Sequence, residues 1–178
     1  MDINSIAASA AAVAALASLV ALILTCFQLK QFRFAHGVDL IFDLDHQFKA
    51  PDLLNARRLS ATALQDHEPT EEIDEVLDFF ETLGILVHRN AVDDELAWNY
   101  FSHWVFRYAA LTKGHIETRR KDECDETYWQ EFEFLVKRLT KYEKKCFILG
   151  LHLPFHRNNP PSYTQEQLDK FLAQEITG

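Results

Sequence analysis

Glycine and proline are scarce in this 178-residue chain, which contains five of each. Antiparallel sandwiches and barrels need many tight turns, and these two residues usually form them, so their scarcity disfavours both architectures. Cysteine is also rare, and the three residues Cys26, Cys124 and Cys146 include no Cys-x-x-Cys pair. An odd number without metal-ligand spacing is typical of free thiols in a reducing compartment.

Basic residues are outnumbered by acidic ones, 18 against 27, and the net charge is −9. A nucleic-acid surface needs clustered Lys and Arg to displace counterions from phosphates, so we expect no nucleic-acid partner. The same balance argues against broad docking on anionic lipid. The 14 Phe, 5 Tyr and 3 Trp supply enough apolar area for the core of one helical domain.

Charge is absent altogether between Ile6 and Phe27. At about 1.5 Å per residue this run would extend roughly 33 Å as a helix, enough to cross a hydrocarbon core of about 30 Å. A cleaved signal peptide is an alternative, but no basic region precedes the run, and its far end carries Leu, Ile and Phe. A buried soluble helix is a second alternative, although such helices seldom stay apolar all round for six turns.

The residues flanking this run predict its orientation. Lys30 and Arg33 follow it and Asp2 precedes it, so the positive-inside rule places the N-terminus outside and residues 30–178 in the cytoplasm. Small residues also share one face of the run at three- and four-residue steps. This face predicts self-association into a homo-oligomer, or it is merely part of an alanine-rich span. Its members are Ala7, Ala11, Ala14, Ser18 and Ala21.

The remaining sequence predicts an all-α fold: a transmembrane anchor (1–29), a cytoplasmic helical bundle (30–150), and a C-terminal loop with an amphipathic helix (151–178). Helical periodicity is clearest over 71–89, with Thr70 as its cap and Asn90 closing it. Further helices are predicted over 30–49, with Gly37 as a bend, over 52–65, from Asp93 to Gly114, and over about 125–149. The spacing of Thr164 and Gln167 is that of a capping box before the last helix.

No motif for a known chemistry stands out. The sequence lacks Glu-x-x-His, His-Glu-x-x-His, a Gly-rich phosphate loop and a Gly-x-Ser-x-Gly elbow. Four polar residues share one helical face and resemble a ligand set, but a solvated face explains them better, so we expect no metal and no cofactor. They are His36, Asp39, Asp43 and His46.

Glu81 is the most conspicuous charge, because it lies at the edge of the apolar face of its helix. A buried lone carboxylate is costly, so we expect a partner, and Arg57, flanked by Leu53 and Leu64, is the natural one. The Arg57–Glu81 pair is predicted to fix the register of two helices. The alternative is a catalytic role for Glu81.

These residues carry a family resemblance. The pattern is Ala56-Arg57-Arg58-Leu59, Phe79-Phe80-Glu81-Thr82-Leu83-Gly84-Ile85-Leu86-Val87, Val92-Asp93, Trp104, and Arg119 or Arg120. Over roughly residues 1–140 the chain resembles a widespread bacterial family of unassigned function with one N-terminal membrane helix and a helical cytoplasmic domain. The resemblance implies a fold type and an inner-membrane address, but no activity.

Three functions follow as hypotheses. The first is a membrane-tethered interaction or regulatory module whose partners are the lipid bilayer and an unidentified protein. The second is an oligomeric effector that perturbs the bilayer, for example in phage defence. The third is an enzyme with an unrecognised site. We expect the first, and therefore no catalytic residues.

Overall fold

The computed structural model of this chain describes the backbone of residues 3–150 and 163–177, and within these ranges the side chains of all but residues 3–17, 30 and 33. These parts form seven helices and no strand, which confirms the all-α class. The helices are α1 (Ile3–Lys49), α2 (Pro51–Asp66), α3 (Glu71–His88), α4 (Asp94–Leu111), α5 (Lys113–Asp122), α6 (Gln130–Ile148) and α7 (Gln165–Thr177).

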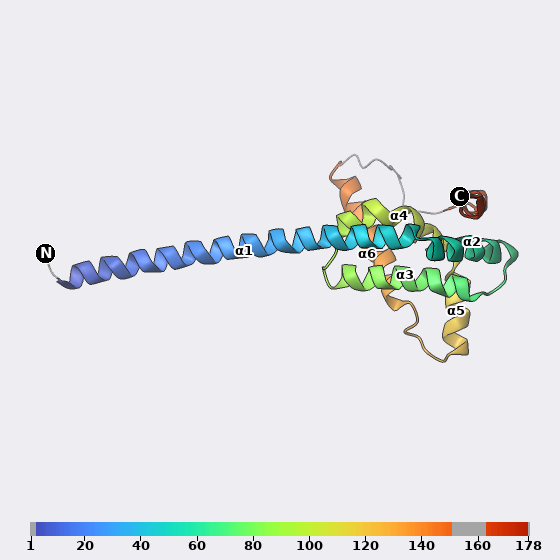
Figure 1. The fold of residues 1–178 in the computed structure, drawn as a ribbon, viewed down its shortest axis with the longest axis horizontal. Helices are drawn as coiled ribbons and strands as arrows, with labels where there is room; N and C mark the ends of the chain where they lie inside the picture. Colours follow the sequence, from blue (N-terminus) through green and yellow to red (C-terminus); the bar gives the residue numbers. More distant parts are fainter. Residues whose placement is uncertain (1–2, 151–162, 178) are drawn as a thin grey trace.

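Helix α1 is one continuous element that projects far out of a compact bundle (Figure 1). Its C-terminal part belongs to the bundle, where Ile41, Leu44 and Phe48 are buried. The helix continues through Gly37 without the predicted interruption. Gly37 instead permits a close approach, because an added Cβ would lie 2.8 Å from the carbonyl oxygen of Ala91 in the turn between α3 and α4. The predicted boundary at residue 29 therefore falls inside a helix, and packing into the bundle begins at Gly37.

Over the residues with described side chains, no helix combines the length and the hydropathy that crossing a bilayer requires. Within the predicted span, the side chains of residues 6–17 lie outside that set.

The core of the bundle is built on α3, which packs against both α2 and α6. The buried residues of α3 follow its helical period, including Ile73, Val76, Phe80 and Leu83, and Phe79 is buried in addition to them. Around them aromatic rings interlock: the centroid of Phe48 lies 5.0 Å from that of Phe79 and 5.5 Å from that of Phe101. Such offset and edge-on pairs add specificity to a core that buried area alone would hold together.

Several helix ends follow local chemistry. Pro51 occupies the first turn of α2, where its missing N–H has no intrahelical partner to lose. The Asp93 carboxylate accepts a hydrogen bond from the backbone N–H of Leu96 at 2.8 Å. Thr164 and Gln167 form the predicted capping box, with side-chain bonds of 3.1 and 3.3 Å. Thr70 occupies the N-cap position of α3, but its side chain makes no capping hydrogen bond.

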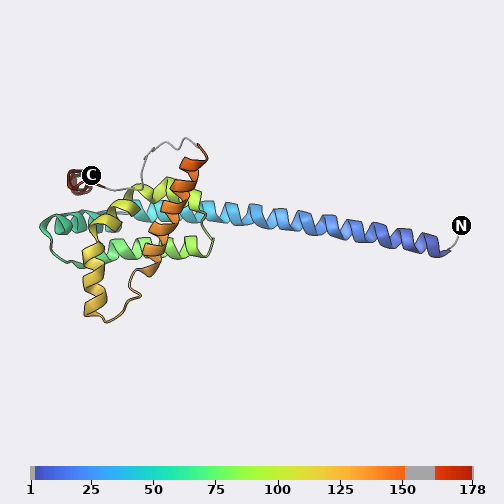
Figure 2. The same ribbon diagram turned by 180° about the vertical axis from the view of Figure 1, so that it is seen from behind.

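Two regions differ from the predicted helix boundaries. The charged stretch after α4 contains a further helix, α5, and Gly114 lies in its first turn rather than marking a stop. Helix α6 begins at Gln130 and not near 125, because Trp129 adopts a left-handed backbone conformation with φ of 52°. The chain changes direction there before α6 crosses the bundle (Figure 2).

The C-terminal helix α7 belongs to the same core as the helices before it. It packs on α2 and α4, with Leu168, Phe171 and Leu172 buried. The predicted amphipathic helix is present, and its apolar face packs against the helices of the predicted bundle region. The loop predicted before it lies outside the described residues over 151–162.

Candidate functional site

The most elaborate polar cluster lies where α7 covers α2. Arg57 donates from Nε and Nη2 to the two carboxylate oxygens of Glu175, each at 2.8 Å. Its Nη1 donates to the backbone carbonyl of Phe48 at 3.2 Å, and its guanidinium carbon lies 4.0 Å from the centroid of the Phe48 ring. Both charged side chains are only 9% exposed. A paired, hydrogen-bonded and stacked guanidinium satisfies the conditions under which a charge can be buried.

The indole of Trp104 completes the shell of this carboxylate, since its Nε1 donates to Glu175 at 3.2 Å. Beneath the pair, the hydroxyl of Tyr108 lies 3.4 Å from Ser60 Oγ. Burial, reinforced by the negative charge of Glu175, raises the pKa of Tyr108 above its ordinary value. The phenol of Tyr108 therefore stays neutral, and both oxygens of the Glu175 carboxylate accept hydrogen bonds. These contacts hold α7 on the core.

The predicted Arg57–Glu81 pair is therefore wrong in its partner, although Arg57 is buried and ion-paired as expected. The counter-ion lies 118 positions away in the chain, on a helix that looked peripheral. A signal for it exists in the sequence. Glu175 falls on the same helical face as the three buried residues of α7, which are Leu168, Phe171 and Leu172.

Glu81 serves a different purpose, because its carboxylate caps α6. Oε2 accepts a hydrogen bond from the backbone N–H of Phe132 at 2.6 Å, and Oε1 accepts one from that of Glu131 at 3.2 Å. Burial raises the pKa of Glu81 above its ordinary value; the two backbone N–H groups oppose that shift, and the charges of Glu131 and Asp78 add to it. A carboxylate at the positive end of a helix is a favourable arrangement.

Gly84, one turn after Glu81, explains the rest of this motif. An added Cβ at Gly84 would collide with the backbone carbonyl of Glu131. The segment from Phe79 to Gly84 therefore forms a docking site for the first turn of α6. The carboxylate of Glu81 accepts hydrogen bonds from the free N–H groups, Gly84 allows the close approach, and Phe80 packs against Phe132. Both oxygens of Glu81 are used in this contact, so its role in the fold is positional.

A second ionic cluster, unpredicted from the sequence, joins α5 to α3. Asp74 accepts hydrogen bonds from His115 Nε2 and Arg119 Nη2, both at 2.6 Å. One turn further along α3, Asp78 accepts a hydrogen bond from the indole of Trp129 at 2.8 Å. The four-residue spacing of His115 and Arg119 on one helix face is the signal that could have indicated it.

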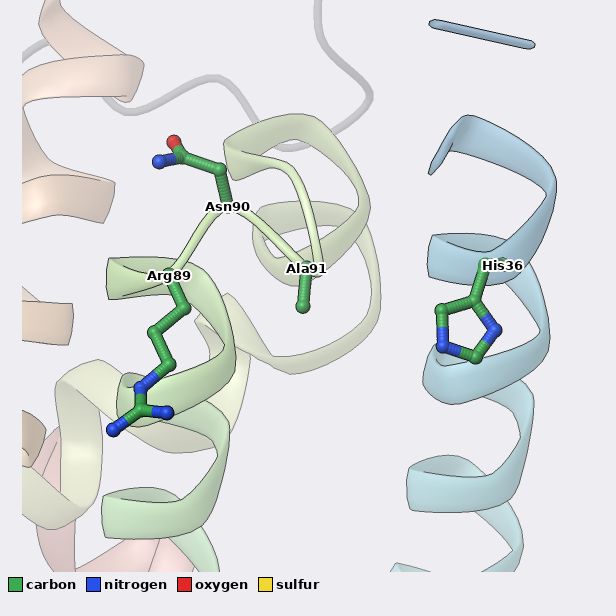
Figure 3. Close-up of a pocket in the computed structure, with 4 residues that line it drawn as sticks. All are labelled: His36, Arg89, Asn90 and Ala91. Carbon is green, nitrogen blue, oxygen red and sulfur yellow. The ribbon is translucent and has the colours of Figure 1, made fainter. Parts of the chain in front are cut away.

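A pocket of about 280 Å³ lies between α1 and the turn after α3, lined by His36, Arg89, Asn90 and Ala91 (Figure 3). The turn is tight because Asn90 closes α3, as predicted, with a left-handed φ of 54°. In Figure 3 the Arg89 and Asn90 side chains point away from His36, so the polar groups do not converge on one point. This geometry is unlike that of a binding pocket with a few convergent polar groups.

The remaining residues singled out by sequence do not assemble into a site. His36, Asp39, Asp43 and His46 are exposed on α1. Across the described ranges, 3–150 and 163–177, no three or more His, Cys, Asp or Glu side chains are arranged to hold a metal ion. Of the small-residue face, Ser18 and Ala21 are exposed on α1. The side chains of Ala7, Ala11 and Ala14 lie outside the described set.

Most of this chain is similar to a known protein family. Residues 5–139 match the family described as domain of unknown function DUF4760. The chain belongs to the DUF4760 family. No curated protein and no solved structure shows significant similarity to it. The match confirms the resemblance to an uncharacterised family over nearly the residues expected, and this DUF4760 region contains Arg57, Glu81 and Gly84 but ends within α6, before Glu175.

Proposed function

We propose that this DUF4760 chain is a membrane-tethered helical interaction or regulatory module, held in a bacterial inner membrane by the first half of α1. The observation that carries the proposal is the exposed apolar surface of α1 outside the bundle. Leu19, Leu22 and Phe27 are more than half exposed there. Burying a large apolar side chain is worth about 1.5–3 kcal/mol, so a helix with many of them favours lipid or another helix as its surroundings.

The charge pattern supports a cytoplasmic bundle. No charged residue lies between Ile6 and Phe27, whereas Lys30 and Arg33 follow directly. Cationic residues next to a span resist translocation, so the bundle remains on the cytoplasmic side. The exposed free thiol of Cys124 in the bundle agrees with a reducing compartment after the span.

An interaction module agrees better than an enzyme with the polar clusters described above. The carboxylates of Glu81, Asp74 and Glu175 are each hydrogen-bonded to groups of the bundle itself. Catalytic groups need access to a substrate and a convergent arrangement around it. These three instead fix α6, α5 and α7 onto the core.

A fusion test addresses both anchor and orientation. A cytoplasmic reporter joined after Gly178 should be active and the full chain should resist alkaline carbonate extraction, because a spanning helix is not released by charge. A periplasmic signal would overturn the orientation, and extraction into the soluble fraction would overturn the anchor. Replacing Lys30 and Arg33 by Asn provides the control, since it should weaken the orientation preference without removing the span.

The bilayer-perturbing effector remains the competing proposal, supported by the exposure of Ser18 and Ala21 on the predicted self-association face. Small residues allow helices to approach closely in lipid. Native mass spectrometry in detergent and a vesicle dye-leakage assay separate the two proposals. A tethered module should leave vesicles intact, whereas an oligomeric effector should release the dye.

A further inference from the structure

The C-terminal end of α6 is unusual for this protein in both its charge and its exposure. Phe147, Ile148 and Leu149 are 57, 80 and 61% exposed, although most large apolar side chains of the bundle are buried. The preceding turns carry Lys137, Lys141, Lys144 and Lys145, all exposed. The four lysines, which we call the collar, thus lie next to three exposed apolar side chains in a chain whose net charge is −9. We call residues 137–149 the α6 tip.

The α6 tip lies at the end of the bundle from which α1 emerges, and both views agree on this placement (Figures 1 and 2). Between Phe27, where the proposed span ends, and Gly37, where α1 enters the bundle, lie about ten residues, or roughly 15 Å of helix. Lipid headgroups occupy about 5–8 Å of that distance. Spanning helices commonly tilt by about 20°, which lowers a laterally placed tip further toward the lipid.

The tip is rigidly mounted, so its direction is fixed by the fold. Glu81 and Gly84 hold the first turn of α6, and Arg138 is paired with Asp94 at 2.8 Å. That pair also occupies Asp94, and Asp93 is occupied in capping α4. Glu143 is the one acidic residue among residues 137–149, and its side chain is only partly exposed, whereas the four lysines are exposed.

We propose that the α6 tip docks onto the anionic headgroups of the membrane that holds α1, as a second lipid contact; this inference rests on the proposed anchor. Lysines provide attraction to anionic lipid, and an aromatic and two aliphatic side chains beside them can enter the interfacial layer. The docking orients the bundle relative to the bilayer and leaves its opposite end, at the turn between α2 and α3, facing the cytoplasm.

The test uses the full chain reconstituted in vesicles. An environment-sensitive fluorophore is attached at Ile148→Cys in a Cys26→Ala, Cys124→Ser background, since Cys146 is buried. With phosphatidylglycerol in the bilayer, headgroup spin-labelled lipid should quench this probe. A probe at Glu68→Cys lies in the turn between α2 and α3, and it should stay unquenched because that turn is at the far end of the bundle (Figure 1).

Charge variants identify the occupant. Each basic residue near an anionic surface contributes about fivefold to binding, so Lys144→Gln with Lys145→Gln should lower the ratio of docked to free tips about 25-fold. Lys113→Gln with Lys121→Gln on α5 makes the same change in net charge away from the tip, and it should leave quenching unchanged.

Four results would overturn the docking. They are absence of lipid quenching at residue 148, equal quenching in pure phosphatidylcholine, insensitivity to the Lys144/Lys145 change, and shielding from both lipid and aqueous quenchers, which would show that protein covers the tip. Carbonate extraction of the same samples separates the two proposals. A chain that resists extraction with an unquenched tip retains its anchor and loses only the docking, whereas an extractable chain loses the anchor itself.

Discussion

Breaking the Arg57–Glu175 pair should destabilise the bundle more than any change of a surface charge. Both side chains are 9% exposed, and the carboxylate also accepts the Trp104 indole N–H. Removing one partner leaves the other buried without a counter-ion, which typically costs about 3–5 kcal/mol. A single domain has only about 5–15 kcal/mol in total. For a chain of this size such a loss corresponds to a fall in Tm of roughly 6–20 °C.

Thermal unfolding of the full chain in mild detergent, followed by circular dichroism, measures the loss. Arg57→Met and Glu175→Leu should each melt well below the unmodified chain. Their combination should recover much of the difference, because a buried ion pair can usually be replaced by apolar residues of similar volume. The Met side chain would pack on Phe48, over which the guanidinium now lies.

Lys49→Met is the matched control, since it removes a cation from the exposed i,i+4 pair with Asp45, whose Lys side chain is 66% exposed. That pair should contribute no more than about 0.5 kcal/mol. The reasoning would be refuted if Glu175→Leu melted with the control, or if the double variant were less stable than both single ones.

Three further predictions concern α6, α3 and α1. Glu81→Ala should cost about 1–3 kcal/mol in chemical denaturation, because the N–H groups of Glu131 and Phe132 lose their acceptor, whereas Glu81→Gln keeps an acceptor oxygen and should cost less. Because the folded-state pKa of Glu81 is raised, the stability of the unmodified chain relative to Glu81→Gln should fall as pH rises through that pKa; a constant difference would contradict the burial of the carboxyl. Gly84→Ala should cost about 1–3 kcal/mol by colliding with the Glu131 carbonyl, while Gly114→Ala, with open space around it, should be neutral or stabilising; equal effects would disprove the close approach. Elemental analysis should find no stoichiometric metal, and one that disappears in His46→Ala would revive the enzyme hypothesis.

Features that depend on neighbours in the sequence were predictable. The period of α3 identified its buried face, and the side chains of Asp93 and Thr164 begin their helices as expected. In α4 the aromatic residues at four-residue steps, Tyr100, Trp104 and Tyr108, do not share one buried face. Tyr108 is buried, but Tyr100 and Trp104 flank the core, whose centre is formed by Trp98, Phe101 and Val105. A four-residue step drifts around a helix of 3.6 residues per turn, so a series with this spacing moves across the buried face instead of following it.

Features that depend on distant segments were not predictable from patterns alone. A charge on an apolar stripe shows that a partner exists, but it does not identify the partner. Glu81 is satisfied by backbone N–H groups, which every residue carries and which leave no trace in composition. Arg57 is paired with Glu175 on α7. The apolar face of α7 could be recognised in the sequence, but its position in the bundle could not.

The extent of the family match makes the Arg57 site informative about the family. The match ends at residue 139, so it includes Arg57 and its stacking partner Phe48 but excludes Glu175. The matched region alone therefore contains a buried guanidinium whose counter-ion comes from outside it. A buried arginine without a partner would cost a large share of the stability of a domain. A family member without a helix like α7 must then supply an acidic side chain from another element, or replace the arginine. Joint presence of the arginine and an acidic C-terminal helix across members would support this argument, and a stable member with the arginine and no acid in reach would contradict it.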